Sequence, residues 1–393
     1  MFNALDALPS DAILKLIAEH ASDSRKEKVD LGVGVFRTEQ GETPVLASVK
    51  KAERHILETQ KSKTYLGSGG DPEFNKLSEK LTFGDDIASE RITTLQTPGG
   101  SGGLRVAAGL VLRARKDATV WHSNPTWANH VPLLGGAGLK LQPYPYYDDA
   151  TRTLVFEQMI ERIKSIPEGD IVLLHGCCHN PTGMDLSTDQ WQALAELVAA
   201  RKLLPFVDMA YQGFANGIEQ DAYAVRLLAG MVPEMIVVTS CSKNFGLYRD
   251  RVGSLSFVCS NAETAATVRS QAHNLVRTMY SMPPDHGAAI VSKILGSATL
   301  RAEWVAEVDG MRARLKDMRR SLVAALRREA PEHDFSHVER ANGMFCFLGI
   351  TEAQVERLKK DCGVYMVNSS RINVAGITPG NVAYLAKSIA SVL

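Results

Sequence analysis

One lysine stands where a nucleophilic amine would be useful. Lys243 follows Met235–Thr239, an apolar and β-branched run that predicts a buried strand. A lysine just past the carboxyl end of such a strand faces a crevice, where loss of water lowers its pKa and frees the amine. A neutral amine in that position is suited to forming a Schiff base. A lone lysine more often extends its amine to solvent, so the neighbouring motifs have to decide between the two interpretations.

A glycine-rich segment, Thr97–Gly103, lies between a predicted strand and a predicted helix at Leu104–Arg115. Glycines let backbone N–H groups approach an anion, and a helix N-terminus adds partial positive charge. The segment therefore predicts a phosphate site, although a tight turn without a ligand would have the same composition. It is not a dinucleotide fingerprint, because the third glycine of that pattern would fall on Arg105.

The same segment contains Gly-x-Ser-x-Gly, which is also the pattern around the nucleophile of many serine hydrolases. In this alternative Ser101 would be the nucleophile, Asp208 the orienting acid and His286 the base, in the expected chain order. The hydrolase interpretation leaves Lys243 without a role.

Two further predicted strands end in polar side chains. Asp208 follows the apolar run Leu204–Val207, and a buried carboxylate there needs a cation or a strong donor. A protonated pyridine nitrogen would be such a partner, and a helix N-cap is the ordinary alternative. Asn180 follows Ile171–Leu174 within an Asn-Pro-Thr-Gly turn, which would project its amide over the same crevice.

Four side chains near that turn, those of His175, Cys177, Cys178 and His179, suggest a metal site. Neighbouring side chains in an extended segment point to opposite faces, so we do not expect all four to converge on one ion. We therefore expect no metal site.

Other residues could complete a cofactor site. Ser240, Ser242 and Arg251 could supply donors and positive charge to a phosphate. Trp127 offers a flat face for an aromatic ring, although a tryptophan packed in the core is the more usual case.

The elements that must position these residues follow an alternating order. Predicted strands alternate with amphipathic segments such as Thr188–Arg201, which is typical of βαβ units with ligands at the carboxyl ends of the strands. Apolar residues recur every three or four positions from Leu300 to Arg328 and predict a long helix that stops before Pro331. This helix would lead into a smaller domain that also holds part of the N-terminal segment. The predicted strands are Ile92–Gln96, Thr119–His122, Ile171–Leu174, Leu204–Val207, Met235–Thr239 and Ser254–Val258.

The composition narrows the functional class. The chain has 393 residues, enough for two or three domains, and 44 basic side chains balance 44 acidic ones, so no charge excess points to nucleic acid. The first residues lack the pattern of a signal peptide, and no apolar stretch is long enough to span a bilayer. The six cysteines show no disulfide-framework spacing, so we expect a reducing, cytoplasmic compartment.

Together these motifs resemble the fold-type I pyridoxal-phosphate aminotransferases, specifically the aspartate and aromatic amino-acid branch of class I. The resemblance covers residues 1–393. It implies an α/β fold, with a large domain built on a mostly parallel sheet flanked by helices and a smaller α+β domain. The implied divisions are an N-terminal arm with part of the small domain at 1–43, a cofactor-binding domain at 44–305 and a small C-terminal domain at 306–393. The motifs that carry the resemblance are Leu31–Gly34, Asn124–Trp127, His179–Gly183, Asp208–Gly213, Ser240–Gly246 and Ser370–Gly376.

The resemblance implies that pyridoxal 5′-phosphate is the cofactor and assigns its reactive parts to single residues. Lys243 would hold the cofactor as a Schiff base and later move the proton between the substrate and the cofactor. Asp208 would keep the ring nitrogen protonated, which makes the ring an electron sink. Asn180 and Tyr211 would hydrogen-bond the phenolic oxygen.

The rest of the implied cofactor site surrounds the ring and the phosphate. Trp127 would stack on the ring, and His130 would lie behind Asp208. Tyr65 of a second subunit would complete the phosphate site. The implied phosphate ligands within one chain are Gly100, Ser101, Ser240, Ser242 and Arg251.

Substrate recognition is implied in the same way. Arg371 would bind the substrate α-carboxylate as a planar bidentate pair. Gly34 would lie where the small domain closes over the substrate. Arg277 would reach from the partner subunit to the side chain of a dicarboxylate, so the family implies a homodimer with shared active sites.

The substrate preference is divided between two branches of the family. Ser101 and Met282 stand where aspartate-specific members usually have threonine and asparagine, whereas Val35 and Thr43 are similar to the aspartate branch. We expect an aromatic amino-acid aminotransferase that uses 2-oxoglutarate and retains aspartate activity, with an aspartate aminotransferase proper as the alternative. A regulator that only senses the cofactor would have little use for the whole catalytic set.

Overall fold

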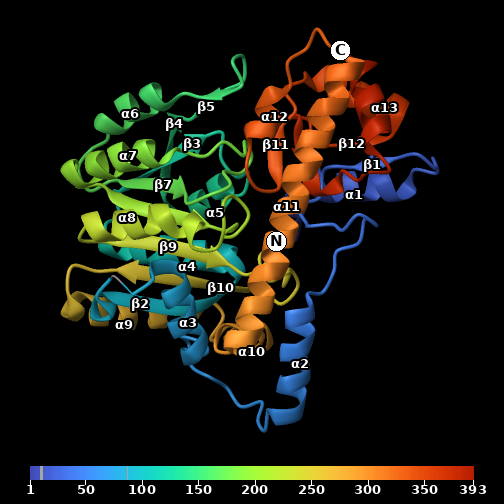
Figure 1. Cartoon of the computed structure of the whole chain (residues 1–393). Helices are drawn as coiled ribbons and strands as arrows, with labels where there is room; N and C mark the ends of the chain where they lie inside the picture. The colour runs from blue at the N-terminus through green and yellow to red at the C-terminus, as the bar shows by residue number, and fades with distance from the viewer. Residues whose placement is uncertain (9–11, 86) are drawn as a thin grey trace.

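The computed structural model describes residues 1–8, 12–85 and 87–393. A seven-stranded sheet with the order β2-β10-β9-β8-β7-β3-β4 forms the centre of the larger lobe (Figure 1). Strands β9, β8, β7, β3 and β4 run parallel, and β10 is antiparallel to both of its neighbours. The strands of this sheet are β2 (Ile92–Pro98), β3 (Thr119–Asn124), β4 (Lys140–Pro145), β7 (Ile171–His175), β8 (Leu204–Met209), β9 (Met235–Ser240) and β10 (Val252–Val258).

The sheet confirms the predicted α/β fold with mostly parallel strands. All six strands predicted from the sequence are present, and most extend one or two residues past the predicted ends. Strand β4 was not predicted. It lies at the edge of the sheet and contains Pro143 and Pro145, which cannot donate to a neighbouring strand and are therefore typical of edges.

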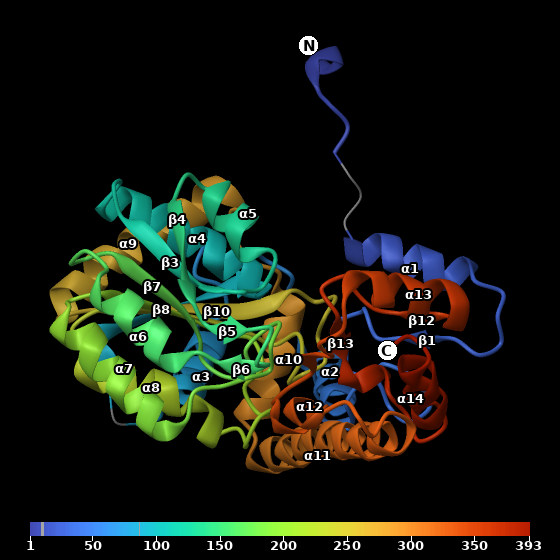
Figure 2. The ribbon, with the colours of Figure 1, turned by 90° about the horizontal axis from the view of Figure 1, so that it is seen from above.

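Helices cover both faces of this sheet, as Figure 2 shows. One face carries α4 (Gly99–Ala114), α5 (His130–Gly135) and α9 (Ala262–Met279), whose apolar residues form one core layer with the strands. The opposite face carries a second layer. The helices of the second layer are α3 (Pro72–Phe83), α6 (Phe156–Lys164), α7 (Thr188–Ala200) and α8 (Tyr223–Met231).

The glycines of the glycine-rich segment form the first turn of a helix, whereas Thr97 and Pro98 end strand β2. Helix α4 begins at Gly99, five residues before the predicted start at Leu104, because the sequence period appears only after the glycines. Gly99 has a positive φ of 69°, and a Cβ atom added there would lie 2.6 Å from an Arg251 guanidinium nitrogen. Glycine therefore lets the helix N-terminus approach that side chain.

A second lobe contains segments from the N-terminal and the C-terminal parts of the chain. Strand β1 (Val29–Asp30) pairs in parallel with β12 (Val364–Tyr365), and β11 (Phe345–Phe347) pairs antiparallel with β13 (Arg371–Asn373). The domain boundaries at 43/44 and 305/306 stay a prediction. The helices of this lobe are α1 (Ala12–Ser22), α12 (Ser336–Arg340), α13 (Glu352–Cys362) and α14 (Val382–Ala390).

The predicted long helix is confirmed as α11 (Ala298–Glu329), which runs from the larger lobe into the second one (Figure 1). It packs at its start against α10 (Asp285–Leu295) and α2 (Ala47–Thr59), and further along against α12 and α14. A short hairpin, β5 (Tyr147–Asp148) and β6 (Thr153–Leu154), completes the strands. Among the described residues, no helix is long and apolar enough to cross a membrane.

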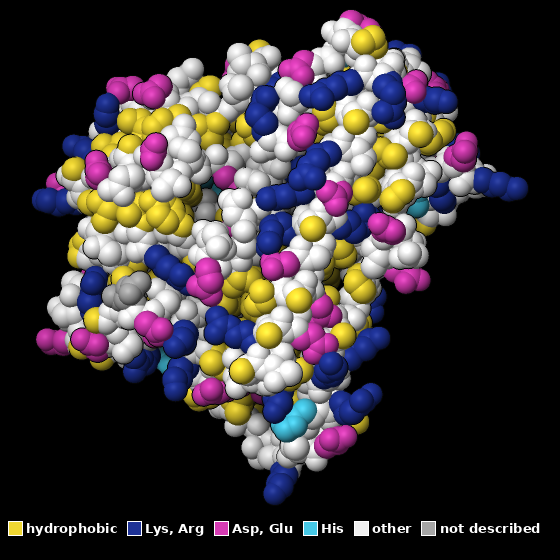
Figure 3. Space-filling view, viewed as in Figure 1, with side chains coloured by type: hydrophobic (Ala, Val, Ile, Leu, Met, Phe, Trp, Pro, Cys, Tyr) yellow, Lys and Arg dark blue, Asp and Glu magenta, His cyan; other side chains and the backbone are white. Residues whose placement is uncertain are grey.

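The surface shows the charge balance of the sequence. On the face drawn in Figure 3, lysine and arginine side chains are interspersed with acidic ones. This distribution agrees with equal numbers of basic and acidic residues in the chain.

Trp304 attaches α11 to the loop that follows β9. Its side chain is fully buried, its Nε1–H donates to the Asn244 carbonyl oxygen at 2.7 Å, and its ring stacks on Phe245 with centroids 4.4 Å apart. Asn244 and Phe245 directly follow Lys243. The packing of α11 therefore determines the position of the Lys243 loop.

We expect Trp304→Ala to lower the free energy of unfolding by about 3–5 kcal/mol, because it removes a fully buried aromatic side chain and leaves a cavity. Trp304→Phe retains the stacking but leaves the Asn244 carbonyl without its donor, so a smaller loss of about 1–3 kcal/mol is expected. Urea denaturation measures both. Leu57→Ala, at a side chain that is 85% exposed, is the control and should leave the stability nearly unchanged.

Candidate active site

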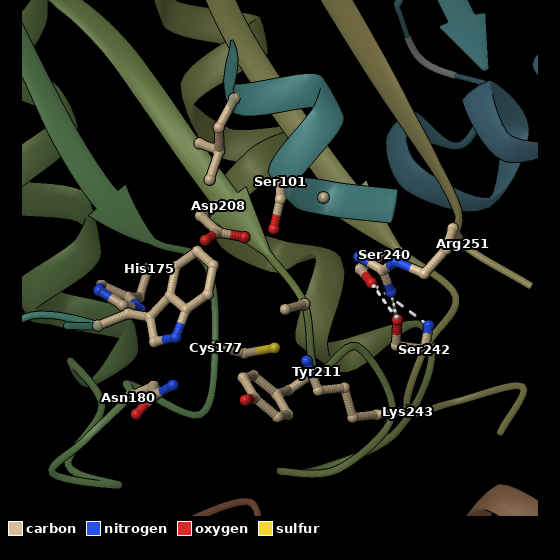
Figure 4. A pocket seen from close by; sticks show the side chains of 14 residues that line it. Ser101, His175, Cys177, Asn180, Asp208, Tyr211, Ser240, Ser242, Lys243 and Arg251 are labelled. Atoms are coloured by element: carbon tan, nitrogen blue, oxygen red, sulfur yellow. Dashed lines mark hydrogen bonds between the residues drawn. The ribbon is translucent and has the colours of Figure 1, made fainter. Parts of the chain in front are cut away.

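A cavity of about 150 Å³ lies at the carboxyl ends of β7, β8 and β9 and against the N-terminus of α4 (Figure 4). Parallel neighbouring strands bring their final residues to one edge, as the alternating pattern predicts. The predicted site residues that line this cavity are Gly100, Ser101, Trp127, Asn180, Asp208, Tyr211, Ser240, Ser242, Lys243 and Arg251.

Lys243 is held in this cavity by the loop after β9. Its Nζ atom lies 4.8 Å from the centre of the Tyr211 ring. Burial lowers the pKa of Lys243 to about 8, with Asp208 opposing and Arg251 reinforcing that shift. A substantial fraction of the amine is therefore unprotonated in mildly alkaline solution, which a nucleophile or a general base requires.

Asp208 is a buried carboxylate near the end of β8. Its Oδ2 accepts a hydrogen bond from His130 Nε2 at 2.9 Å, and His130 Nδ1 is hydrogen-bonded to Thr126 Oγ1 at 2.8 Å. Burial pushes the pKa of Asp208 upward, but the hydrogen bond and charge of His130 and the charge of Lys243 outweigh burial and lower it. Asp208 is therefore an anion that faces the cavity, and it is not a helix N-cap.

An anion cradle occupies one end of the cavity. The first turn of α4 contributes Gly100 and Ser101, and a hydrogen-bonded cluster lies opposite (Figure 4). In that cluster the Arg251 guanidinium donates to Ser242 Oγ at 3.2 Å, and Ser240 Oγ donates to Ser242 Oγ at 3.1 Å. A helix N-terminus together with a guanidinium group favours a phosphate-sized anion.

Asn180 and Tyr211 add neutral polar groups to the cavity wall. Asn180 is buried, and its Oδ1 atom has no hydrogen-bond partner among the described residues. Burial raises the pKa of Tyr211 far above its usual value, so its hydroxyl stays protonated and can donate.

Arg371 lies in β13 of the second lobe. Its guanidinium carbon is 4.3 Å from the centre of the Phe345 ring, and its Nη2 donates to the Gly32 carbonyl oxygen at 3.0 Å. Its Nε atom is buried and lacks a partner within the described ranges. Gly34 is close by, since a Cβ atom added to it would lie 3.0 Å from the Phe345 ring. The arginine therefore retains a donor for an added carboxylate.

Besides Gly34, His130 and Arg371, which contact or lie near other site residues, three predicted residues do not line this chain's own cavity and are exposed. Tyr65 is 93% exposed in the segment between α2 and α3, and Arg277 is exposed near the end of α9. His286 is exposed on α10, and Asp208 is hydrogen-bonded to His130 instead. The alternative serine-hydrolase triad is therefore not assembled around Ser101.

The expectation that neighbouring side chains in this segment point to opposite faces was wrong for Cys177 and Cys178. The Sγ atoms of Cys177 and Cys178 and a carboxylate oxygen of Asp221 lie within 4.8 Å of one another. Cys178 has a positive φ of 51°, so the segment is not extended and the two side chains need not point apart. Burial raises the pKa of the Cys178 thiol, and Asp221 already accepts three backbone N–H groups, so we assign no metal there.

Sequence reasoning missed part of the cavity wall. His175 is the last residue of β7, and its Nε2 is hydrogen-bonded to Thr126 Oγ1 at 3.0 Å. The pattern of a polar residue after an apolar strand, which indicated Asp208, could also have indicated His175. Burial lowers the pKa of His175 to about 3, which makes it a neutral imidazole. The lining residues that were not predicted are Leu104, His175, Cys177 and Ala210.

Comparison with known proteins agrees with this geometry. Residues 26–389 match the family model of class I and II aminotransferases. The chain is 46% identical to the aspartate aminotransferase of Escherichia coli K12, with 100% of both chains covered. It is 45% identical to the aromatic-amino-acid aminotransferase of Pseudomonas aeruginosa, over 100% of this chain and 98% of that relative.

A solved structure extends the likeness to three dimensions. The aromatic-amino-acid aminotransferase of Burkholderia pseudomallei, covalently bound to pyridoxal phosphate, is 42% identical, with a TM-score of 0.98 over 100% of this chain and 99% of that chain. From its sequence, its fold and the cavity at the strand ends, the chain belongs to the class I and II aminotransferase family.

Proposed function

We propose that this protein is a pyridoxal-phosphate-dependent transaminase that moves the amino group between aromatic amino acids and 2-oxoglutarate. Tyrosine and phenylalanine are the proposed aromatic substrates, and aspartate and glutamate are also accepted. The observation that carries the proposal is that a half-buried Lys243, an anionic Asp208 and an anion cradle share one cavity. Relatives named for aromatic, tyrosine and aspartate transamination support the same range of substrates.

The residues of the cavity fit the cofactor. The cradle with Ser242 and Arg251 matches a phosphate group, and the Asp208 carboxylate matches a protonated ring nitrogen. Lys243 Nζ would carry the covalent bond, and the unpartnered Asn180 amide oxygen marks a polar group whose partner has to come from a ligand or water. Trp127, half-buried in the wall, would stack on the ring.

The residues then have separate tasks in transamination. Pyridoxal phosphate, when bound, withdraws electrons from the substrate carbon that loses its proton. Asp208 remains anionic and would hold the proton on the ring nitrogen, with His130 fixing its orientation. Lys243 would take the proton from the substrate Cα and pass it to the cofactor, because its pKa of about 8 provides an unprotonated amine.

Substrate binding is proposed to use both lobes and both subunits. Arg371 would bind the α-carboxylate that all these substrates share. Arg277 and Tyr65 are exposed and lie outside this chain's own cavity, which supports their proposed reach into a partner's site. Residues 1–8 extend away from the two lobes (Figure 2), and the side chains of Phe2 and Leu5 are exposed, which also supports a homodimer.

An aspartate aminotransferase proper is the second candidate, and the 46% identity to such an enzyme favours it. Val35 and Thr43 agree with that branch, whereas Ser101 and Met282 agree with the aromatic branch. A cytoplasmic location is proposed from the cysteines, all six of which are free thiols.

Replacing Lys243 with Ala should abolish covalent attachment of the cofactor, because Lys243 is the only lysine among the described residues that line the cavity. We expect transamination to fall by several orders of magnitude and the visible absorption of the bound cofactor to lose its dependence on pH. Absorption spectra and mass spectrometry after borohydride reduction measure the two effects. Lys202→Ala, at an exposed lysine paired with Glu168, is the control. Near-normal turnover in the Lys243 variant would reject the proposed function.

The two arginines should separate the substrate classes. Arg371→Ala removes the partner of a carboxylate that every substrate has, so it should impair aspartate and tyrosine alike. Arg277→Ala should reduce the efficiency with aspartate and glutamate by roughly two to four decades, the cost of a largely desolvated charge pair. Tyrosine and phenylalanine should be affected much less. Single-turnover measurements with each amino acid test this, and equal losses in both classes would make Arg277 a structural residue.

A further inference from the structure

Asp185 receives hydrogen bonds from both lobes. It lies just past the turn that contains Asn180, and its Oδ1 accepts the His179 N–H at 2.9 Å. Its Oδ2 accepts two donors, the Cys178 N–H at 2.9 Å and the Asn342 side-chain amide at 3.1 Å. The two backbone donors immediately precede Asn180, which lines the cavity. A single carboxylate thus fixes the start of this turn and bonds a residue 157 positions away.

Asn342 belongs to a segment that fits tightly against the same turn. Its own N–H donates to the Gly183 carbonyl oxygen at 2.6 Å. Gly183 has a positive φ of 68°, and a Cβ atom added there would overlap the Phe345 carbonyl oxygen and lie 2.9 Å from the Ala341 Cβ. The turn and the segment 341–345 are therefore in direct backbone contact, and glycine is required at their junction.

The same segment is held from its other side by Arg319 of α11. This arginine is only 1% exposed, so its guanidinium group has to be satisfied inside the protein. It donates to the carbonyl oxygens of Asn342 at 3.2 Å, Gly343 at 2.8 Å and Phe345 at 3.0 Å. These bonds leave the backbone of the segment little freedom to move relative to α11.

The segment ends in the residue that supports the substrate arginine. Phe345 begins β11, which pairs with β13, the strand that carries Arg371. The Phe345 ring lies 4.3 Å from the Arg371 guanidinium carbon and meets the Tyr211 ring edge-on with centroids 6.1 Å apart. A displacement of this segment would therefore move the surface on which the guanidinium group rests.

We propose that Asp185 is a positioning residue that couples the Asn180 turn of the cofactor site to the Phe345 support of Arg371. An ionised carboxylate offers only acceptors, and here its three donors come from the turn and from the segment 341–345. The proposal rests on the proposed transaminase function, since that function assigns Asn180 to the cofactor and Arg371 to the substrate.

Two substitutions separate the two sides of this link. Asp185→Asn keeps the shape of the side chain, but its NH₂ group must face at least one of the donors that the carboxylate accepts. Asn342→Ala removes only the side-chain bond from Asn342 to Asp185 and leaves both backbone N–H groups on Asp185. Asp170→Asn is the matched control, because Asp170 is also buried and accepts the Thr119 N–H at 3.1 Å and Trp121 Nε1–H at 2.9 Å, at the opposite end of the sheet.

Two measurements on the cofactor-loaded enzyme report separately on the Asn180 turn and on Arg371. The pH midpoint of the visible absorption change reports on the cofactor end, and the half-saturating amino-acid concentration in single turnover reports on Arg371. We expect Asp185→Asn to shift the midpoint by about half a pH unit or more and to raise the half-saturating concentration about tenfold. Asn342→Ala should raise that concentration by a similar factor and leave the midpoint nearly unchanged.

The double variant tests whether the two residues act together. If Asp185 and Asn342 form one link, the double variant should need no more substrate than Asp185→Asn alone. If the two substitutions instead raise the half-saturating concentration by factors that multiply, the coupling is overturned. It is also overturned if Asp185→Asn loses only thermal stability, which is the result expected for the control Asp170→Asn. If Asp185→Asn does not fold, an unchanged half-saturating concentration in Asn342→Ala overturns the proposal and a raised one supports it. An inactive wild type would reject the proposed function, whereas an active wild type with unaffected variants rejects only the coupling.

Discussion

Lys243 and Asp208 line one cavity, where Asp208 is buried and Lys243 half-buried, and a charge that loses its water destabilises a fold unless it is neutralised or paired. The two residues meet this requirement in different ways. Asp208 keeps its charge because His130 donates to it at 2.9 Å, whereas Lys243 loses part of its charge because its pKa falls to about 8. A fixed anion beside a partly neutral amine is the arrangement that proton transfer at a substrate carbon requires. Much of the surrounding structure limits the contact of these two side chains with water and fixes their positions.

Strand β10, which is antiparallel to both of its neighbours in the sheet, helps to meet this requirement. Strand β10 returns directly after the loop that holds Lys243, and its register places Gly253 opposite both Thr97 of β2 and Ser240 of β9. A Cβ atom on Gly253 would lie 2.8 Å from the Gly99 carbonyl carbon, so glycine lets β10 pass the start of α4. Arg251 directly precedes β10, and its guanidinium group lies beside the N-terminus of α4. The anion cradle is thus a consequence of how the loop after β9 closes back onto the sheet.

The sequence predicted the parts of this site that depend on local pattern. Apolar runs shortly before Asn180, Asp208 and Lys243 mark strand ends, and parallel strands bring such ends together, so the cavity could be inferred before its shape was known. Features without a local pattern were not predicted. The predicted start of α4 was five residues too late, because glycines do not show a helical period. The short distance between the Cys177 and Cys178 side chains depends on the positive φ of Cys178, which no sequence pattern indicates. Contacts between Asp185 and Asn342 join positions 157 residues apart, where no sequence spacing could indicate them.

Helix α11 links the two lobes by contacts at two points of its length. Trp304 bonds to the loop that follows Lys243, and Arg319, fifteen residues further on, holds the segment that ends at Phe345. At 1.5 Å per residue these points are about 22 Å apart along one rigid element. Because the same helix contacts the loop of Lys243, the proposed reactive lysine, and the support of Arg371, the proposed substrate arginine, the second lobe cannot move freely relative to the cavity. A shift of Arg371 toward a bound carboxylate would therefore strain the contacts of Trp304 or those of Arg319, because the helix between these two residues is one rigid element.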